Sequence, residues 1–331
     1  MTKAWVEPDI RDEIVETILE YKKRTGIPVN RLLKYLVLKE SKYYEWRRRY
    51  GIPNRHNGKI PKATWLFGHE KEAIIEYAMN NREEGYRRLC YRMIDEDVVY
   101  ASPSSVYRVL HTAGLLYKFT NRKNKSKGLG YTQPDGPHKE WHIDISYVNV
   151  VGTFMFLIAI IDGYSRYVVY HELRGSMEEK DVEIVVQKAL DKFPDEKPRI
   201  ISDHGSQFIA KDFKKFIRYA GLVHTFTSVG YPQSNGKIER LFRTLKTDCI
   251  RRQSFLSPED ARNQLMEYVW YYNQKRLHSA IGYVTPFDKL IGRDKEILAV
   301  REQKLARARE LRVKYNTNST LTQNPVYSDS R

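Results

Sequence analysis

The sequence has few cysteines and no long apolar run. Cys90 and Cys249 are the only two cysteines among 331 residues, which excludes a disulfide framework and a cysteine-rich zinc site. Nowhere do about 18 apolar residues follow one another, so we expect no membrane span and no membrane partner. The first residues lack the apolar core of a signal peptide. These absences predict a protein of the reducing cell interior, in the cytoplasm.

Acidic residues are also scarce relative to basic ones. The chain has 57 Lys and Arg against 41 Asp and Glu, a net charge of +16 and a pI near 9.5. Hydrophobic residues make up 41%, so the chain is long and apolar enough for two or three globular domains. The charge favours a nucleic acid as the partner, although a merely basic, soluble protein has the same composition.

Changes in composition predict six segments along the chain. Two helical, helix-turn-helix-like domains precede a mixed α/β domain, and a basic arm with a disordered tail follows it. The predicted ranges are an N-terminal helical domain 1–50, a linker 51–67, a second helix-turn-helix-like DNA-binding domain 68–116, a basic connector 117–136, a catalytic core 137–291, and the arm and tail 292–331. Within the arm, residues 301–315 read as a helix that faces DNA or solvent, and the disordered tail is expected from residue 316.

Apolar spacing predicts the helices of the first domain. In "PDIRDEIVETILEYKKRTG", a helix ends at Gly26, a typical C-terminal cap. The residues expected on its buried face are Ile10, Ile14, Ile18 and Leu19.

The second domain contains a candidate recognition helix, "SPSSVYRVLHTAGLL". Ser102 is a suitable N-terminal cap, Pro103 suits the first helical position, and Gly114 ends the helix. The predicted buried residues are Val106, Val109 and Leu110, and the residues expected to face outward toward DNA are Ser104, Ser105, Tyr107 and Arg108. An ordinary helical bundle would show the same pattern. The following connector supplies candidate phosphate contacts at Lys123 and Lys125.

The pattern changes to strands near residue 138. In "WHIDISYV" the residues Trp141, Ile143, Ile145 and Tyr147 alternate with the polar residues His142, Asp144 and Ser146. Hairpin signals at Gly152 and at Asp162-Gly163 predict three antiparallel strands. Helices and strands then alternate, which predicts a five-stranded mixed sheet flanked by helices.

Three acidic residues occupy informative places on this scaffold. Asp144 lies within the first strand, Asp203 ends the fourth strand, and Glu239 begins the helix after the last one. Each has an ordinary explanation as a half-exposed strand residue, a turn former or a residue favoured by the helix dipole. If the first and fourth strands pair, however, the three carboxylates meet, and carboxylates in one pocket suit Mg²⁺, a hard cation that takes oxygen ligands. Two such ions serve phosphoryl transfer.

Several ordered motifs resemble a known family. "WHIDISYV", "IDGYSRYVVYHEL", "ISDHGSQF", "YPQSNGKIERLFRTLKTD" and "YYNQKRLHSAIGYVTPFDKL" resemble the DDE transposases of bacterial insertion sequences, relatives of retroviral integrases. The spacing of 35 residues between Asp203 and Glu239 (239 − 203 − 1) is typical of this branch. The resemblance implies a ribonuclease H-like core in which Asp144, Asp203 and Glu239 bind two Mg²⁺ ions, with Mn²⁺ as a substitute. Relatives often have Asn at the position of His204, which we interpret as a loop residue.

The resemblance also implies where DNA binds. Lys246 matches a basic position that touches the DNA end, and Gln233 and Asn235 lie in a loop that approaches the substrate. Lys237 and Arg243 flank Glu239 and are candidate phosphate contacts. We assign Arg276 and His278 to structural or phosphate-contact roles and expect the aromatic residues Trp270, Tyr271 and Tyr272 to be structural.

These features predict a nucleoid-associated DNA transposase. By the resemblance, it cuts DNA at the ends of its mobile element and joins the freed 3′-hydroxyl to target DNA, as a homo-multimer on double-stranded DNA, with a protein of an upstream reading frame as a further candidate partner. Two alternatives remain open at this point: a non-catalytic, domesticated DNA-binding derivative, and a nuclease of the same fold that cleaves RNA in hybrids.

Overall fold

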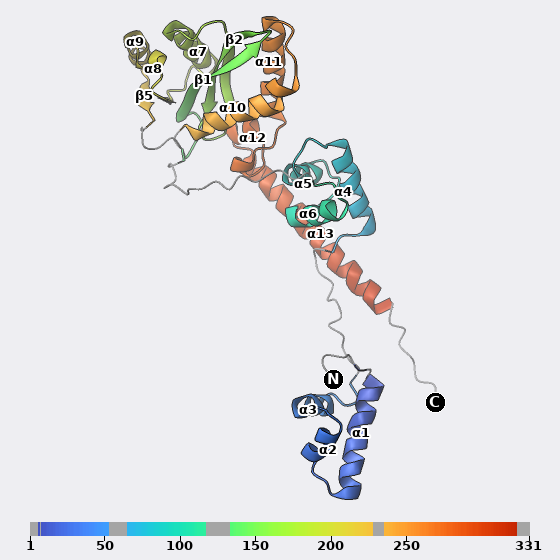
Figure 1. The fold of residues 1–331 in the computed structure, drawn as a ribbon. Coiled ribbons are helices and arrows are strands. Elements are labelled where there is room, and N and C mark those ends of the chain that lie inside the picture. The colour runs from blue at the N-terminus through green and yellow to red at the C-terminus, as the bar shows by residue number, and fades with distance from the viewer. Residues whose placement is uncertain (1–5, 7, 53–64, 117–132, 228–234, 323–331) are drawn as a thin grey trace. The chain divides into compact units, whose positions relative to one another are not determined.

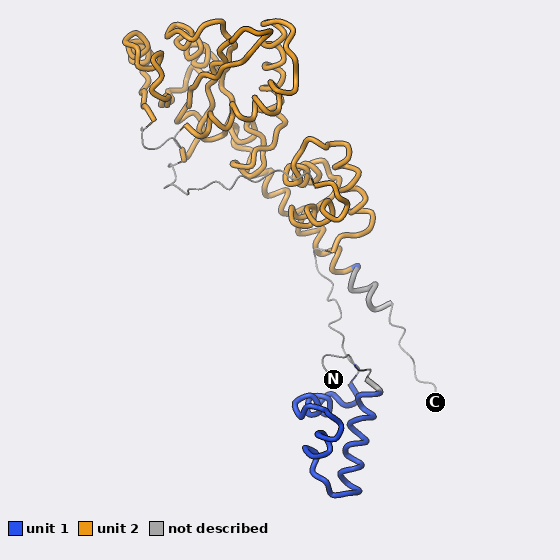
Figure 2. The backbone as a smooth tube through the Cα atoms, viewed as in Figure 1, with its two compact units in different colours: residues 1–62, 315–331 blue, residues 63–314 orange. Residues whose placement is uncertain are grey.

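The computed structural model describes residues 6, 8–52, 65–116, 133–227 and 235–322. The chain divides into two compact units, residues 1–62 with 315–331 and residues 63–314 (Figure 2). The finer division into six segments stays a prediction.

The first unit contains three short helices around its own core. They are α1 (Pro8–Thr25), α2 (Val29–Tyr35) and α3 (Glu40–Arg48). Gly26 adopts a φ of +68° directly after α1, which confirms the predicted helix end. The predicted buried face of α1 is partly wrong. Ile10 and Leu19 are exposed, because α2 and α3 cover the side of α1 that carries Val15 and Ile18.

The second unit begins with another group of three helices. These are α4 (Gly68–Asn80), α5 (Tyr86–Asp95) and α6 (Pro103–Thr112). The ends of α6 are as predicted: the Ser102 hydroxyl accepts a hydrogen bond from the Ser105 amide at 3.3 Å, and Gly114 has a φ of +70°. The core of this group is made by the buried side chains of Ile74, Leu89, Met93, Ile94, Val106 and Leu110.

A long C-terminal helix packs against these three helices. It is α13 (Asp294–Thr322), and its Leu305 joins their core. Arg301 binds both carboxylate oxygens of Asp95 at 2.6 and 2.7 Å, and Arg312 binds Glu70 at 2.6 Å. Both arginines are buried, so the prediction that this arm faces DNA or solvent is wrong for them. The helix also continues to Thr322, beyond the predicted start of the tail.

The rest of the second unit is built on one five-stranded sheet. Its strands are β1 (Glu140–Val150), β2 (Thr153–Asp162), β3 (Val168–Arg174), β4 (Arg199–Ser202) and β5 (Val223–Phe226). Their order is β3-β2-β1-β4-β5, with β1 to β3 antiparallel and β4 and β5 parallel to β1. The predicted mixed sheet is confirmed. The two-residue turn between β1 and β2 has positive φ at Val151 and Gly152, as its Gly predicts.

Helices cover both faces of this sheet (Figure 1). On one face lie α7 (Glu179–Lys192), α8 (Ser206–Ile209) and α9 (Lys211–Tyr219), and on the other lie α10 (Gly236–Asp248) and α11 (Pro258–Gln274). The short helix α12 (Pro286–Leu290) leads toward α13. Because α10 and α11 cover the predicted polar face of β1, His142 and Ser146 are buried there rather than half exposed.

Apolar side chains fix α10 on the sheet. Ile238, Leu241, Phe242 and Leu245 are buried against β1 and β2, as the spacing predicts. Each burial is worth about 1.5–3 kcal/mol. The opposite face of α10 is therefore held at a defined place beside the sheet.

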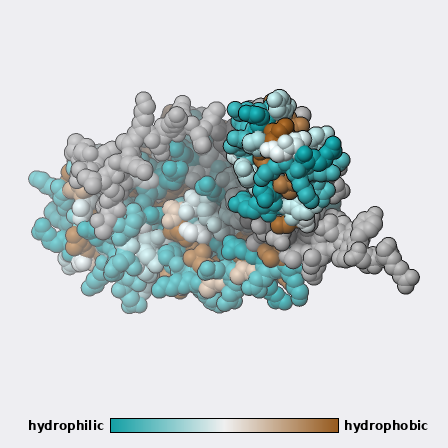
Figure 3. All heavy atoms as spheres, turned by 90° about the horizontal axis from the view of Figure 1, so that it is seen from below, coloured by the Kyte–Doolittle hydropathy of each residue, from teal (hydrophilic) through white to brown (hydrophobic). Residues whose placement is uncertain are grey.

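The face seen in Figure 3 is mostly hydrophilic, with hydrophobic residues in small separate patches. No helix among the described residues is both long and apolar enough to span a bilayer.

Candidate active site

Pairing of β1 with β4 brings two of the candidate carboxylates together. The parallel register aligns His142 with Ile201. Asp144 and Asp203 each lie two residues further along, at the same level of neighbouring strands. Side chains two residues apart along a strand point to the same face of the sheet. Asp144 and Asp203 therefore point to the same face as His142 and Ile201, which is the face that α10 covers.

Helix α10 supplies the third carboxylate. Glu239 lies on its first turn and is exposed, while Ile238 beside it is buried in the sheet core. The start of α10 is also held by polar contacts: the ammonium of Lys237 lies 4.0 Å from the Glu140 carboxylate of β1, and both side chains are largely buried. Gly163 makes room for this contact, since a Cβ there would lie 3.1 Å from the Lys237 nitrogen.

The Asp144 carboxylate is buried and lies within the fields of the other two acids. Its Oδ1 accepts a hydrogen bond from the Ile145 amide at 2.8 Å. The pKa of the Asp144 carboxyl is raised to about 7. Burial is the main cause, and the charges of Asp203 and Glu239 act in the same direction, whereas the Ile145 amide and Lys246 oppose the rise. Asp203, Glu239 and Lys246 are therefore close enough to Asp144 for their charges to act on its carboxylate.

Asp203 is oriented by the loop that follows β4. Its Oδ1 accepts a hydrogen bond from the Gly205 amide at 2.9 Å, and a Cβ on Gly205 would lie 3.1 Å from this oxygen. The His204 ring stacks on Phe226 with centroids 5.0 Å apart, which agrees with its interpretation as a loop residue.

Asn235 is a fourth polar residue of the site. It precedes α10, is 5% exposed, and directs its amide nitrogen toward Asp144 Oδ2 at 3.5 Å. Its Oδ1 is buried and has no hydrogen-bond partner within the described residues. A buried oxygen without a donor beside the Asp144 carboxylate suits a hard cation, which takes oxygen ligands.

The donor set therefore fits a hard divalent cation, although the carboxylates are not drawn together around one point. Over the ranges that the structure describes, no three His, Cys, Asp or Glu residues form a group that could hold a metal ion. Asp144 and Asp203 are fixed by strands and backbone amides, whereas Glu239 is exposed on a helix surface. Binding a cation requires Glu239 to turn toward the two aspartates.

The structure separates the predicted DNA contacts into accessible and buried residues. Arg243 is exposed and Lys246 is half-buried on α10, and Ser104 and Arg108 are exposed on α6. The residues Gln233, Lys123 and Lys125 lie outside the described residues.

Two of the predicted DNA contacts are wrongly oriented for this role. Ser105 is 3% exposed and turns inward to bind Ser102, because it occupies the capped first turn of α6. The Lys237 side chain is 8% exposed, because its ammonium turns toward Glu140, and burial lowers its pKa to about 8.

The sequence analysis used Asp162 only as a hairpin signal, whereas in the structure its carboxylate is buried at the end of β2. Asp162 accepts hydrogen bonds from the His138 amide and from the amide and hydroxyl of Ser165, at 2.6–2.8 Å. It holds the turn that begins at Gly163, beneath Lys237. The "DGYS" motif contains this signal, since an Asp three residues before a Ser is typical of a side chain that closes its own turn.

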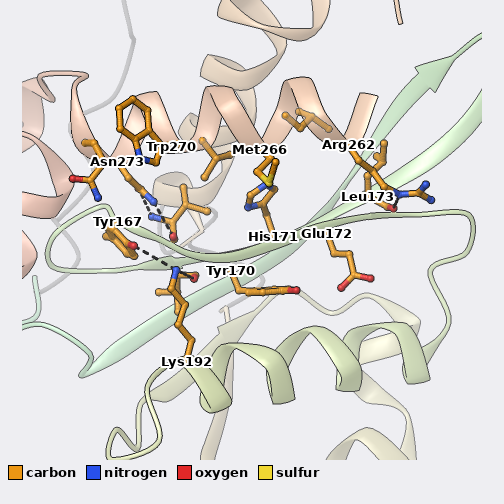
Figure 4. Close-up of a pocket in the computed structure, with 15 residues that line it drawn as sticks. Tyr167, Tyr170, His171, Glu172, Leu173, Lys192, Arg262, Met266, Trp270 and Asn273 are labelled. Atoms are coloured by element: carbon orange, nitrogen blue, oxygen red, sulfur yellow. Dashed lines mark hydrogen bonds between the residues drawn. The ribbon is translucent and has the colours of Figure 1, made fainter. Parts of the chain in front are cut away.

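A separate pocket of about 500 Å³ lies between α11 and the edge strand β3, away from the three acids. In Figure 4, Met266, Trp270 and Asn273 project from α11 toward β3, and Lys192 binds the hydroxyl of Tyr167. Trp270 is 58% exposed, so the prediction that it is structural is wrong, whereas Tyr272 is buried as predicted.

Comparison with known families matches the sheet domain. Residues 134–232 and 220–286 each match a family model described as integrase core domain. The matched region contains β1 to β5 and α10, and thus the three acids.

Several transposases resemble the chain over most of their length. The transposase for insertion sequence element IS904 of Lactococcus lactis is 26% identical over 204 residues, covering 57% of this chain and 81% of that protein. The transposase for IS629 of Shigella sonnei is 24% identical over 276 residues, which are 80% of this chain and 92% of that protein. Transposase InsF for IS3A of Escherichia coli is 24% identical over 285 residues, which are 80% of this chain and 94% of that protein.

Among solved structures, similar chains occur in retroviral assemblies. One is from a simian T-cell lymphotropic virus intasome in complex with PP2A regulatory subunit B56 gamma, at 18% identity and a TM-score of 0.42, covering 66% of this chain and 74% of that one. Another is the HTLV-2 integrase catalytic core domain in complex with magnesium, at 20% identity and a TM-score of 0.35, covering 47% and 97%. The two family matches show that residues 134–286 form an integrase core domain, and over most of its length the chain is similar to transposases of bacterial insertion sequences.

Proposed function

We propose that this transposase is a Mg²⁺-dependent polynucleotidyl transferase whose catalytic residues are Asp144, Asp203 and Glu239. The observation that supports this proposal is the parallel pairing of β1 with β4, because Asp144 of β1 and Asp203 directly after β4 each lie two residues beyond the paired His142 and Ile201, and Glu239 lies on the first turn of α10, which covers this face. The mutual effect of these charges on Asp144 supports the assignment.

Each residue has a distinct part in this proposal. Asp144 and Asp203 are the rigid ligands, since a strand and a backbone amide fix each carboxylate. Glu239 completes the set from the surface of α10, and the unpartnered Oδ1 of Asn235 adds a neutral oxygen. When bound, the ions stabilise the attacking and leaving oxygens of a phosphodiester and make water or a 3′-hydroxyl a better nucleophile.

The proposed substrates are the ends of the mobile element and the target DNA. Lys246 and Arg243 follow Glu239 on successive turns of α10 and are placed to bind phosphates beside the reacting bond. Cutting at one end and joining to the target use the same carboxylates in succession. We propose a homo-multimer, because the two ends of an element must be joined to one target site.

Replacement of Asp203 tests the proposal. Duplexes copied from the borders of the element are incubated with Mg²⁺, and both the cut strand and the strand-transfer product are measured. Asp203→Asn is expected to reduce both products about a thousandfold, because it removes a charged ligand worth several kcal/mol in the transition state. Asp212→Asn is the matched control, since Asp212 is an exposed acid on α9.

The outcome separates this proposal from a DNA-binding derivative without activity. Cutting by Asp203→Asn at the wild-type rate would remove Asp203 from the catalytic set. Binding of the borders by the wild-type chain without any Mg²⁺- or Mn²⁺-dependent product would favour the non-catalytic alternative.

A further inference from the structure

A groove rich in arginine lies between the helices α4 to α6 and the integrase core. It has a volume of about 630 Å³ and is bordered by the start of α5, by α10 and by the segment 276–283. The charged residues that line it are Arg87, Arg88, Arg240 and Arg276, and no carboxylate lines it. Arg240 directly follows Glu239, so the groove begins beside the candidate active site.

Three of the four arginines of the groove, Arg87, Arg88 and Arg240, differ from the arginines around it in their partners. Behind the groove, Arg92 pairs with Glu84 at 2.6 Å and Arg252 pairs with Glu83. Within the described part of the chain, Arg88 and Arg240 have no carboxylate within ion-pairing distance, and Arg87 interacts with the side chains of two tyrosines, Tyr86 and Tyr283. A concentration of positive charge without acids is unfavourable unless an anion binds there.

Two further groups show how positive this groove is. Arg276 binds Asp248 through one terminal nitrogen at 3.3 Å, yet its Nε is buried and has no hydrogen-bond partner within the described ranges. The pKa of His278 is lowered to about 3. Burial is the main cause, and nearby positive charges act in the same direction, those of Arg276, Arg166, Arg240 and Arg88. His278 is therefore neutral, and the groove carries its charge on arginines alone.

The groove continues toward the candidate recognition helix. An adjoining pocket of about 530 Å³ shares Tyr86, Arg87 and Tyr283 with it and reaches Ser104 at the start of α6. The walls are held together by packing: the rings of Tyr91 and Tyr283 stack with centroids 4.7 Å apart, and Arg301 binds both Asp95 of α5 and the carbonyl oxygen of Tyr283. One continuous track thus connects α6 with the helix that carries Glu239.

We propose that this arginine groove binds the phosphate backbone of the element-end DNA, between the N-terminus of α6 and the cut site at Glu239. The choice of DNA as the polyanion rests on the proposed function, whereas the position of the contacts rests on the groove. Arginine suits this role because its planar guanidinium can donate two hydrogen bonds to one phosphate. The α4–α6 helices and the core would then bind one DNA segment as a single surface.

The salt dependence of binding tests the groove directly. The probe is a fluorescent border duplex, and its affinity for the full chain is measured over a range of KCl concentrations without divalent metal. Arg88→Gln with Arg240→Gln is expected to weaken binding roughly ten- to a hundredfold at moderate salt and to reduce the slope of log K against log[salt] by about 1.8, which is 0.9 for each lost phosphate contact. Arg88→Lys with Arg240→Lys should retain most of the slope, because the charge remains.

A matched pair of substitutions controls for net charge. Lys211→Gln with Arg218→Gln removes the same charge from exposed positions of α9, and it is expected to leave the slope near the wild-type value. Equal slopes for the wild type and the groove variant would overturn the inference, and so would equal losses in the groove and control variants. Thermal melting of each variant confirms that it is folded.

Chemical crosslinking gives a second measurement that needs no loss of binding. Both native thiols are buried, at 0% and 1% exposure for Cys90 and Cys249, so an introduced cysteine is the reactive one. Ala280→Cys, at an exposed position lining the groove, is expected to form a disulfide with a duplex that carries an activated thiol tether on its backbone. Lys211→Cys is the control, and equal crosslinking at both positions would count against the groove.

The same duplex separates a failure of this inference from a failure of the proposed function. If the wild type cuts and joins the borders while Arg88→Gln with Arg240→Gln retains the wild-type slope, the groove assignment is wrong and the catalytic one stands. If the Arg88→Gln, Arg240→Gln variant has a smaller slope of log K against log[salt] but the wild type makes no product with either metal, the groove is a DNA-binding site and the catalytic assignment is wrong.

Discussion

Asp144 connects the chemistry of the site to the stability of the fold. Its pKa is about 7 in the folded chain, whereas in the unfolded chain the carboxyl returns to about 4. Between these values the folded state retains a proton that the unfolded state releases. This group therefore makes the free energy of unfolding fall as the pH rises from about 4 to 7.

Asp144→Asn is expected to remove this dependence. In metal-free buffer the variant should be more stable than the wild type at pH 8, by at most about 4 kcal/mol, since three pKa units correspond to that energy. At pH 4 the gain should vanish. Urea unfolding at both pH values measures the difference, with Asp195→Asn as the control at an exposed position. A gain of equal size at both pH values would show that burial of the charge is not the cause.

The positions of the proposed catalytic residues were easier to predict than the orientation of their neighbours. Asp144 and Asp203 follow from the strand pattern and the motif, because alternation alone decides which face a strand residue occupies. Lys237 and Ser105 do not follow from such a rule. Lys237 turns toward Glu140, which is distant in sequence, and Ser105 turns into its own helix cap. A side chain with a polar partner nearby takes the direction that the partner sets.

At the scale of elements, α13 depends on the ion pairs of two buried arginines, Arg301 and Arg312. Arg312 is 3% exposed and donates to Glu70 at 2.6 Å and to the Tyr100 carbonyl at 2.7 Å. Arg312→Ala is expected to lower the free energy of unfolding by about 3–5 kcal/mol, because it leaves the Glu70 charge buried without its partner. Urea unfolding followed by circular dichroism provides the measurement.

Arg309→Ala is the matched control for this prediction, since Arg309 is exposed on the same helix. It should change the stability by less than about 0.5 kcal/mol. Similar effects of the two substitutions would mean that α13 does not support α4 through this ion pair.

Most elements could be predicted from local patterns, but their partners could not. The strands, the α6 cap and the apolar face of α10 follow from periodicity and turn residues. The partner of α13 does not, because a basic helix suits DNA, solvent or an acidic protein surface equally well. Only the fold brings Asp95 and Glu70 next to Arg301 and Arg312. The exposure of Ile10 and Leu19 on α1 has the same explanation, because the packing of α2 and α3 decides which side of α1 is covered.

At the scale of the whole molecule, the cores show how the chain is divided. The core of α1 to α3 contains residues of these helices alone, whereas the core of α4 to α6 includes Leu305 of α13. Two clusters on the faces of the sheet complete the second unit. Composition predicted separate helical domains on either side of a linker, yet it could not show that the second domain shares its packing with a helix some 200 residues later.

This division predicts that the second unit folds without the first. A chain that begins at residue 63 keeps every residue of the two sheet cores and of the α4–α6 core. We expect it to unfold in urea at the same midpoint as the corresponding transition of the full chain, because no buried apolar contact of these cores is removed. The deletion removes Trp5 and Trp46 but keeps Trp65, Trp141 and Trp270. With Trp65→Phe and Trp270→Phe in both chains, and with Trp5→Phe and Trp46→Phe in the full chain, the fluorescence of Trp141, which is fully buried in the sheet, reports the transition. A lower midpoint would show that α1 to α3 contribute to the stability of the core, and the division by packing would then be wrong.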